Sequence, residues 1–440
     1  MLAPLSWLKE YVEIDVTAEQ LQEKLFGAGF EVEELIEVGR DISGVVVGQV
    51  ISCDLIPDTH IHVCKVDCGP HGVLQICCGA DNVAVGGKYP VALVGATVYQ
   101  TARDHETIEG VMTIKKGKLR GEESNGMLCS GVEIGLNEDL YPGAGFCGLL
   151  VLPEDAVPGA DVKPIVGLDD YIFDIGLTAN RPDCQSMIGM AREVAAVLKK
   201  EFKMPPLDYK ESGKQINFTV KVEAPDLCPR YIGHYVSDIT IGPSPAKMRR
   251  LLALVGIRSI SNIVDITNFV LKEFGQPMHA FDLRMLENHS IIVRRAHKGE
   301  KIVTLDEKEF TLSEEHLVIC DGQKPVALAG IMGGLNSEIT NDTQEVFFEA
   351  AKFARDNIRR TSRALGQSSD SSARYEKGVD EYSTILGMQR ALHLIDQLGC
   401  GKVSSTHIVA AAGDEPTAHA LEVSVTKLNN LLGITVPEAE

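Results

Sequence analysis

The 440-residue sequence lacks the features of a secreted or membrane-bound protein. Its first residues contain no basic flank followed by an apolar segment of signal-peptide length, and no later window is apolar enough to span a bilayer. The 11 cysteines are odd in number and have no regular spacing, which argues against a disulfide framework. We see no internal repeat and no low-complexity run. These absences predict a cytoplasmic protein with reduced thiols and no membrane partner.

Basic residues are also fewer than acidic residues. The chain has 42 Lys and Arg residues against 62 Asp and Glu residues, which gives a formal net charge of −20. Such an overall field argues against a protein that coats nucleic acid. Phosphate contacts, however, depend on charge within a Debye length of about 8 Å at physiological salt. Any binding of RNA must therefore depend on local basic clusters.

A chain of this length predicts about three domains. Residues 1 to about 40 include a capping box at Thr17–Gln20, and short strands separated by turn residues then predict an antiparallel barrel to about residue 150. A helix from Ser186 to Glu201 precedes a proline-containing linker. From Ile216 to about Gly399, strands and helices alternate in a larger α+β unit.

The last stretch reads as the beginning of a domain that the sequence does not complete. We expect a strand at Leu421–Val425, a short helix at Lys427–Leu432 ended by Gly433, and the first turn of another helix at Pro437–Glu440. A sequence that stops at a helix start predicts a fragment of a longer protein.

One segment rich in Cys and His raises the possibility of a zinc site. It contains Cys53, His60, His62, Cys64, Cys68, Cys77 and Cys78. No Cys-x-x-Cys pair is present, and the adjacent Cys77 and Cys78 would point to opposite faces of a strand. Because cysteine is a common small core residue, buried core thiols are the better interpretation, and we predict no metal site.

A basic cluster follows in the predicted barrel. Lys116, Lys118 and Arg120 lie among glycines, and Ser124 comes shortly after them. Glycines allow a ligand to approach the backbone, and Lys and Arg side chains reach phosphates. Charge alone favours a solvated hairpin, but a barrel with a basic loop is a recurrent binder of single-stranded or loop RNA.

A third group of residues offers the parts of a chemical site. Pro277 stiffens the exit from a helix that ends at Gly275, which would hold His279 near Asp282 on a short extended segment. The other members are Arg258, Gly330, Gly333, Gly334, Glu349, the basic helix with Arg355, Arg359, Arg360 and Arg363, and the segment Gly366–Glu376. Together they offer hydroxyls, one imidazole and one carboxylate, rimmed by guanidinium groups that suit a polyanion. Spacing does not establish that they converge, and we interpret Arg374 and Glu376 as a buried structural ion pair.

These residues also carry a family resemblance. The most specific motifs are Leu5–Val12, Lys118–Gly121, Gly126–Ser130, Asn180–Cys184, Gly256–Ser259, Asp265–Asn268, Gly275–Asp282 and Arg374–Asp380. In this order, essentially end to end, they make the chain resemble the N-terminal part of the beta subunit of bacterial phenylalanyl-tRNA synthetase.

The resemblance implies a multidomain α+β fold. Residues 40–150 would form the family's tRNA-binding oligonucleotide-fold barrel, inserted in a small α/β domain made of residues 1–39 and 151–205. Residues 210–400 would form the editing domain, which hydrolyses tyrosyl-tRNA made by mistake, and residues 401–440 would begin a truncated α/β domain. Such editing is needed because a pocket for phenylalanine cannot strongly reject an isostere that only adds a hydroxyl.

Residue roles follow from the same resemblance. Glu349 would hydrogen-bond the tyrosine hydroxyl, while His279, Arg258 and Ser369 would position the ester and the attacking water. Gly333, Gly334 and Ser371 would shape the pocket, and Lys116, Lys118, Arg120 and Ser124 would contact tRNA. The chain departs from the family where it carries Ser369-Asp370-Ser371 in place of the commoner Thr-Asp-Ala, and in the loop Pro57–His62.

The resemblance also names partners. Phenylalanine attachment with ATP and Mg²⁺ would belong to the complete enzyme and its alpha subunit, in a heterotetramer of two alpha and two beta subunits that binds tRNA(Phe). The family's magnesium cluster would fall beyond Glu440, so this fragment would need no cofactor. The alternative function is a non-enzymatic tRNA-binding or assembly scaffold whose editing pocket has decayed.

Overall fold

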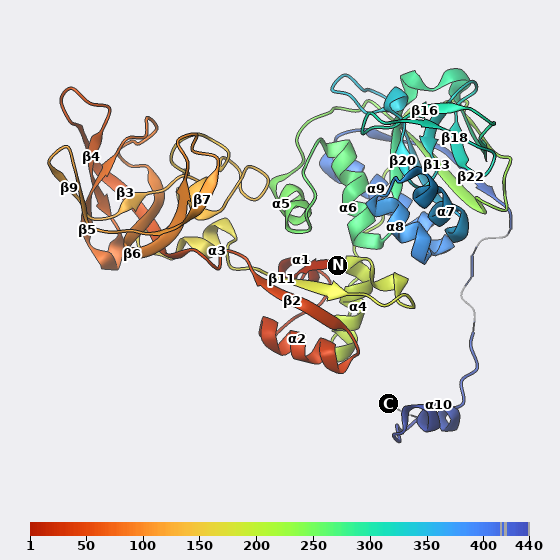
Figure 1. Ribbon diagram of the computed structural model, residues 1–440, viewed down its shortest axis with the longest axis horizontal. Coiled ribbons are helices and arrows are strands. Elements are labelled where there is room, and N and C mark those ends of the chain that lie inside the picture. The colour runs from red at the N-terminus through yellow and green to blue at the C-terminus, as the bar shows by residue number, and fades with distance from the viewer. Residues whose placement is uncertain (414–415, 418–419, 439–440) are drawn as a thin grey trace.

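The computed structural model describes residues 1–413, 416–417 and 420–438, which form a mixed α+β chain with several sheets (Figure 1). The prediction of a multidomain α+β protein is confirmed at this level. No helix among the described residues is both long and apolar enough to cross a bilayer.

The N-terminal part is built from segments on both sides of a long excursion of the chain. A three-stranded sheet has the order β1-β11-β2. Its strands and helices are β1 (Leu2–Pro4), β2 (Glu31–Glu37), β11 (Tyr171–Gly176), α1 (Leu5–Leu8), α2 (Ala18–Gly27) and α4 (Met187–Leu198). The predicted capping box of α2 is present, with Thr17 and Gln20 bonding each other's backbone amides.

The excursion between β2 and β11 forms a six-stranded antiparallel sheet of order β10-β6-β3-β4-β5, with β7 also paired to β6 (Figure 1). Its strands are β3 (Ser43–Leu55), β4 (His62–Asp67), β5 (Val73–Cys78), β6 (Lys88–Thr101), β7 (Ile108–Thr113) and β10 (Met127–Leu128). Successive residues of β3 enter different apolar clusters, Val45 and Val47 on one side and Val46 and Val50 on the other, as a strand covered on both faces requires. Two short strands, β8 (Gly117–Leu119) and β9 (Glu122–Ser124), form a hairpin at its edge.

Three cysteines in this region behave as core residues, whereas Cys53 and Cys77 are half-buried. Cys64, Cys68 and Cys78 are buried in one apolar cluster. Burial raises the pKa of the Cys68 thiol to about 11 and raises that of Cys64 further still, so both remain protonated at neutral pH. Protonated thiols in an apolar cluster fit the interpretation as core thiols.

The larger C-terminal part contains two sheets, one of four strands in the order β14-β21-β13-β22 and one of five in the order β12-β15-β18-β19-β20. The strands are β12 (Thr219–Val222), β13 (Arg230–Ser237), β14 (Met278–Asp282), β15 (Ser290–Arg295), β18 (Leu317–Cys320), β19 (Pro325–Leu328), β20 (Met332–Gly333), β21 (Val346–Lys352) and β22 (Lys402–Ala411), with a separate hairpin of β16 (Lys301–Val303) and β17 (Glu309–Thr311). The helices are α5 (Ala246–Leu254), α6 (Asn262–Phe274), α7 (Arg355–Leu365), α8 (Asp370–Lys377) and α9 (Glu381–Leu398), and α3 (Val162–Val166) precedes them in the chain.

One apolar core joins the N-terminal part to helices α6 and α9. Trp7 stacks on Phe269 of α6 with ring centroids 4.9 Å apart. The fully buried Glu273, also on α6, accepts hydrogen bonds from the Tyr11 hydroxyl (2.6 Å) and from the Arg390 guanidinium (2.8 and 3.0 Å). Removing one partner of such a buried pair typically costs about 3–5 kcal/mol, so these contacts fix α6 firmly.

The predicted elements near the end of the chain are correct only in part. Helix α10 (Val425–Leu432) forms and ends at Gly433 in the left-handed conformation, as expected. The predicted strand at Leu421–Val425 is wrong: residues 421–424 pair with no strand, and Leu421 is 85% exposed, because no element of the described part of the chain covers it. The predicted helix start at Pro437–Glu440 lies partly outside the described residues.

Candidate functional site

A cavity of about 440 Å³ lies in the larger part of the molecule, between α6, the strands β14, β20 and β21, and the start of α8. This volume is within the range of roughly 300–1,000 Å³ that is usual for small-molecule sites. Its walls include Asn268, His279, Gly333, Glu349, Ser369 and Ser371, together with apolar side chains such as Leu328 and Ile331.

Strand pairing brings His279 and Glu349 together. β14 runs antiparallel to β21, and His279 lies directly opposite Glu349 in this register. Opposed residues project from the same face of a sheet with Cβ atoms about 4.5–5.5 Å apart. Helix α6 ends at Gly275 in the left-handed conformation (φ 73°), and the buried Gln276 donates to the Ala351 carbonyl (3.0 Å). These contacts fix the point from which β14 starts, and with it the position of His279.

Glu349 is a buried carboxyl group in largely apolar surroundings. It is 5% exposed, and the Tyr231 hydroxyl donates to its Oε2 atom at 3.1 Å. Burial raises the pKa of Glu349 to about 8, with the Tyr231 hydrogen bond acting in the opposite direction. The group is therefore mostly protonated at pH 7, and a neutral carboxyl group can both donate and accept a hydrogen bond.

His279 is the second ionisable group on this face. Its Nε2 atom is buried and has no hydrogen-bond partner among the described residues. Its ring packs edge-on against the ring of Phe281, with the two ring centroids 4.5 Å apart. Burial lowers the pKa of His279 to about 4, so the imidazole is neutral at pH 7. A Cβ atom on Gly333 would lie 2.4 Å from Cε1 and 2.9 Å from Nε2 of this ring. Glycine at position 333 therefore makes room for the imidazole.

Ser369 lines the cavity, but its hydroxyl is already engaged. It caps α8, donating to the Ile331 carbonyl (2.6 Å) and accepting from the Ser372 amide (3.1 Å). These contacts tie the start of α8 to the turn before β20. Ser369 is therefore arranged to hold the wall of the cavity, and Ser371, which is half-buried, lines the same cavity.

Two residues expected at the site do not line the cavity. Arg258 is exposed and lies two residues before Ile260, which does line it. Gly334 lies behind the wall, where its amide donates to the Val326 carbonyl (2.7 Å) and a Cβ atom would lie 2.6 Å from that oxygen. Gly334 thus shapes the turn that carries Gly333.

The predicted ion pair between Arg374 and Glu376 is wrong. Arg374 instead bonds the Asp370 carboxylate four residues earlier (3.2 Å), and Lys272 of α6 approaches the same carboxylate at 3.2 Å. On a helix, residues four apart are neighbours whereas residues two apart are not. Asp282, which lies near His279 in the sequence, pairs with Arg284 and Thr343 and is fully buried, so its role is structural.

Tyr231 is a site residue that sequence reasoning missed. It lies in β13, where every residue is buried, and the sequence offers no sign of its partner. A buried tyrosine usually needs a hydrogen-bond acceptor, which is the one available signal. The acceptor, Glu349, lies 118 residues away and is reached only through the pairing of β13 with β21.

The basic hairpin β8–β9 lies apart from the cavity. Arg120 and Gly121 form its two-residue turn with φ of 50° and 93°, and Lys116, Lys118 and Arg120 are exposed. Lys118 approaches Glu123 only to 3.9 Å. Ser124 differs, because its hydroxyl accepts from the Cys77 amide and donates to the Gly126 carbonyl, both at 3.1 Å. The cations are available to a ligand, whereas the Ser124 hydroxyl ties the hairpin to β5.

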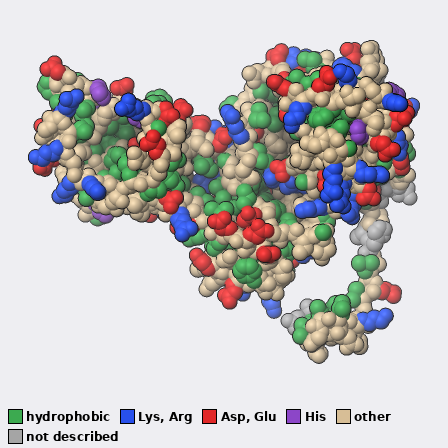
Figure 2. All heavy atoms as spheres, in the orientation of Figure 1, with side chains coloured by type: hydrophobic (Ala, Val, Ile, Leu, Met, Phe, Trp, Pro, Cys, Tyr) green, Lys and Arg blue, Asp and Glu red, His purple; other side chains and the backbone are tan. Residues whose placement is uncertain are grey.

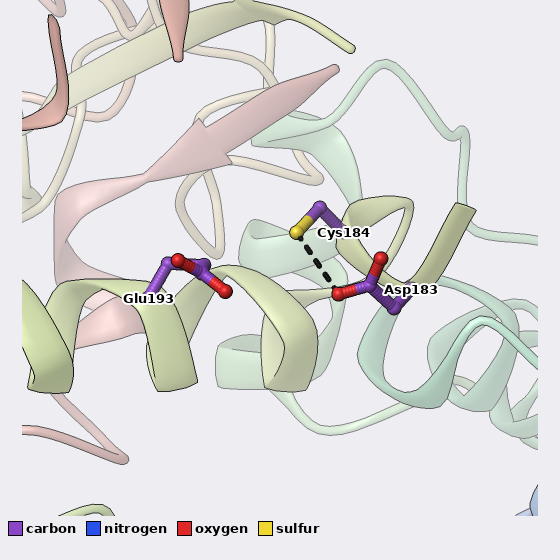
Figure 3. A group of neighbouring side chains, drawn as sticks. All are labelled: Asp183, Cys184 and Glu193. Carbon is purple, nitrogen blue, oxygen red and sulfur yellow. Dashed lines mark hydrogen bonds between the residues drawn. The ribbon is translucent and has the colours of Figure 1, made fainter. Parts of the chain in front are cut away.

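One cluster among the described residues has the composition of a metal site. Asp183, Cys184 and Glu193 place ligand atoms within 4.8 Å of one another, and the Cys184 thiol is directed at Asp183 (Figure 3). The Arg181 guanidinium donates to Asp183 (2.8 Å), to Cys184 (3.0 Å) and to Glu193. A cation of the protein thus already occupies the centre of this cluster, and we interpret the cluster as structural.

Comparison with known proteins places both regions in named families. Residues 227–400 match the family described as "B3/4 domain", and residues 45–161 match "Putative tRNA binding domain". The whole chain is 44% identical over 443 residues to "Phenylalanine--tRNA ligase beta subunit" of Syntrophus aciditrophicus and 42% identical over 444 residues to the protein of the same name in Geobacillus kaustophilus. The chain belongs to the phenylalanine-tRNA ligase beta-subunit family.

The match covers 100% of the chain but 53% and 54% of these two beta subunits, so the chain spans about half the length of the curated relatives it matches. A solved N-terminal fragment of the phenylalanyl-tRNA synthetase beta subunit from Pyrococcus horikoshii is 18% identical, covering 62% of this chain and 75% of the fragment. Its TM-score of 0.31 is too low to support an argument about the fold. In this chain the cavity lies within the region that matches the B3/4 domain, and the basic hairpin lies within the region that matches the tRNA-binding domain.

Proposed function

We propose that this chain is the tRNA-binding and editing portion of a phenylalanine-tRNA ligase beta subunit, and that its cavity hydrolyses tyrosyl-tRNA(Phe). The observation that carries the proposal is the opposition of Glu349 and His279 on one cavity wall. This pair combines a recognition group with a water-positioning group at the distance that strand pairing sets.

Glu349 supplies the discrimination between tyrosine and phenylalanine. Its neutral carboxyl group forms a hydrogen bond with the phenol hydroxyl of a bound tyrosyl group, as donor or as acceptor, while apolar residues such as Leu328 contact the ring. Phenylalanine offers this carboxyl group no hydroxyl, so the group is left with its hydrogen bond from Tyr231 and gains none from the ligand. A site built to hydrogen-bond a substrate hydroxyl rejects an analogue that lacks it much more strongly than an apolar pocket rejects an extra hydroxyl.

Water is the nucleophile of the proposed reaction. The unpartnered Nε2 atom of neutral His279 orients a water molecule, whose oxygen attacks the ester carbonyl carbon. The bond to the ribose oxygen breaks, the proton lost by water goes to that oxygen, and the products are tyrosine and tRNA with a free hydroxyl. Arg258 assists at the ester end, Gly333 and Gly334 shape the pocket, Ser369 holds its wall and Ser371 adjoins the substrate.

Binding of tRNA is assigned to the six-stranded sheet and its basic hairpin. Lys116, Lys118 and Arg120 contact phosphates, and Ser124 supports them by fixing the hairpin. The match to "Putative tRNA binding domain" over residues 45–161 supports an oligonucleotide-fold barrel at residues 40–150. Strand β2, which precedes this barrel in the chain, pairs with β11, which follows it. This pairing supports insertion of the barrel in a small domain of residues 1–39 and 151–205. Residues 210–400 then form the editing domain, and residues 401–440 begin another.

The complete enzyme has further partners in this proposal. An alpha subunit carries out phenylalanine attachment with ATP and Mg²⁺, and two alpha subunits assemble with two beta subunits. The acidic cluster at Asp183 and Glu193 does not fit Mg²⁺, because the Arg181 guanidinium already occupies it.

Hydrolysis of tyrosyl-tRNA(Phe) by the purified chain tests the proposal. Wild type should release tyrosine well above the rate of a Glu349→Ala control of equal thermal stability. If the two proteins release tyrosine at the same rate, the enzymatic function is wrong, and the non-enzymatic tRNA-binding scaffold remains.

A further inference from the structure

Helix α7 exposes a group of arginines that the proposed reaction does not use. Arg355, Arg359 and Arg363 repeat every four residues and therefore share one face, about 12 Å long, and Arg360 adjoins it. All four side chains are exposed, and none takes part in an ion pair within the described part of the chain. Figure 2 shows Lys and Arg side chains gathered over α7 and α8. We call these four residues the arginine stripe.

Helix stability does not account for the arginine stripe. Like charges four residues apart repel each other, and a cation in the first turn, where Arg355 lies, opposes the helix dipole, whereas Arg363, in the last turn, is favoured by it. Asp356 is the acidic residue of that turn, and its backbone carbonyl, rather than its carboxylate, accepts from Arg360 (3.2 Å). The opposite face of α7 buries Ile358 and Thr361. The helix is therefore held by packing and keeps an uncompensated positive face outward.

The end of α7 is connected to the wall of the cavity. Ser362, next to Arg363, donates to the Gln367 carbonyl (2.7 Å), and the Gln367 side chain donates to Asp306 (3.0 Å) in the β16–β17 turn, one residue after the cavity residue Leu305. Two residues beyond Gln367, Ser369 caps α8 and lines the cavity. The arginine stripe thus ends beside two walls of the candidate site.

We infer that the arginine stripe binds the phosphate backbone of the single-stranded 3′ end of an aminoacylated RNA and directs its terminal ester toward the cavity. This inference rests on the proposed editing function. Guanidinium groups bind phosphates through paired N–H donors, and a row of them suits a chain of phosphates. With an overall net charge of −20, the protein attracts RNA where local cations outweigh this field, so a local uncompensated row of cations has a large effect on where a strand binds.

The first test is binding of a fluorescent single-stranded RNA ending in CCA, followed by anisotropy at several salt concentrations. The Arg359→Glu/Arg363→Glu variant should bind at least about tenfold more weakly than wild type. Its salt dependence should have a slope smaller by about 1.4, because each phosphate contact in a single strand contributes about 0.7. A Lys203→Glu/Lys298→Glu control changes the net charge equally at exposed positions and should bind within about twofold of wild type.

A second variant separates the arginine stripe from the basic hairpin. The loss caused by Arg359→Glu/Arg363→Glu should be the same in a Lys118→Glu/Arg120→Glu background, because the two regions are independent. Equal binding by the stripe variant, the charge control and wild type, with circular dichroism showing all of them folded, overturns the inference. So does a loss that disappears in the hairpin background.

Kinetics distinguish failure of the inference from failure of the proposed function. With tyrosyl-tRNA(Phe), the stripe variant should raise KM while Glu349→Ala lowers kcat. If wild type hydrolyses the ester and the stripe variant has the wild-type KM, the inference alone is wrong. If wild type does not hydrolyse it, the editing function is wrong, and the anisotropy result then decides only whether the stripe binds RNA.

Discussion

The cavity and the basic hairpin place polar side chains in opposite environments. At the cavity, Glu349 is buried and His279 is half-buried with its Nε2 atom covered, and burial shifts the pKa of each in the direction that favours the neutral form. At the hairpin, Lys118 and Arg120 are exposed, and Lys118 approaches its nearest carboxylate only to 3.9 Å. A desolvated hydrogen bond discriminates between ligands, whereas exposed charges attract any polyanion. In the proposed function, the cavity therefore selects the ligand and the hairpin attracts the RNA.

The largest expected effect comes from Gly333→Ala at the cavity. A Cβ atom there would lie 2.4 Å from the His279 ring, which has to move. Since a displacement of about 1 Å can cost about 10²-fold in rate, we expect tyrosyl-tRNA hydrolysis to fall by about 100-fold while tRNA affinity is retained. Single-turnover hydrolysis and filter binding measure the two quantities.

Gly242→Ala is the matched control for that substitution. No atom lies within 4 Å of the position that its Cβ would take, and its φ is not in the left-handed region. Its hydrolysis rate should equal that of wild type. A Gly333→Ala variant as active as Gly242→Ala would show that the position of His279 does not matter.

The pH dependence of stability tests how strongly Glu349 is desolvated. Its pKa of about 8 lies above the unfolded value, so the protonated form stabilises the fold below about pH 4 and this contribution is lost as pH rises through 8. Between pH 5 and 8 the unfolding free energy should fall by up to about 1.4 kcal/mol per pH unit on this account. Glu349→Gln should lack this component in urea titrations. Parallel curves for the two proteins would mean that Glu349 is solvated and that the cavity resembles the hairpin.

A smaller effect is expected at the hairpin. Lys118→Ala/Arg120→Ala should reduce tRNA affinity several-fold and reduce the slope of log K against log salt by about 1.8, since each phosphate contact on a duplex contributes about 0.9. The rate of hydrolysis at saturating tRNA should stay at the wild-type value. A loss that is independent of salt would show that these cations do more than attract phosphates.

The smallest effect is expected for Ser124→Ala. Its hydroxyl bonds the Cys77 amide and the Gly126 carbonyl, so the substitution should lower stability by about 1 kcal/mol. Its effect on tRNA affinity should be about twofold or less. A loss as large as that of the double cation variant would make Ser124 a direct RNA contact.

Local patterns predicted much of the fold. The capping box at Thr17 and the end of α6 at Gly275 depend on neighbours in the sequence, and both were predictable. The strand expected at Leu421–Val425 does not form because apolar alternation gives a strand only where a partner edge exists, and no described residue pairs with this segment.

The cavity was harder to predict from the sequence, because it depends on the register in which distant strands pair. Family motifs named His279, Glu349 and Ser369, but their convergence depends on β14 pairing with β21. The hydrogen bond between Tyr231 and Glu349 joins residues 118 positions apart. Arg374 pairs with Asp370 and not with Glu376, because residues four apart are neighbours on a helix and residues two apart are not. The sequence therefore indicated which side chains belong to the site, whereas the contacts between them could be identified only in the folded structure.

The central claim is that Glu349 reads the tyrosine hydroxyl, and the most direct measurement compares hydrolysis of tyrosyl-tRNA(Phe) with that of phenylalanyl-tRNA(Phe). Wild type should prefer the tyrosyl ester by at least about 100-fold, since a site built to hydrogen-bond a substrate hydroxyl heavily penalises a substrate that lacks it. Glu349→Ala should reduce this ratio to about tenfold or less. An unchanged ratio in Glu349→Ala would contradict the account, because some other group would then distinguish the two amino acids.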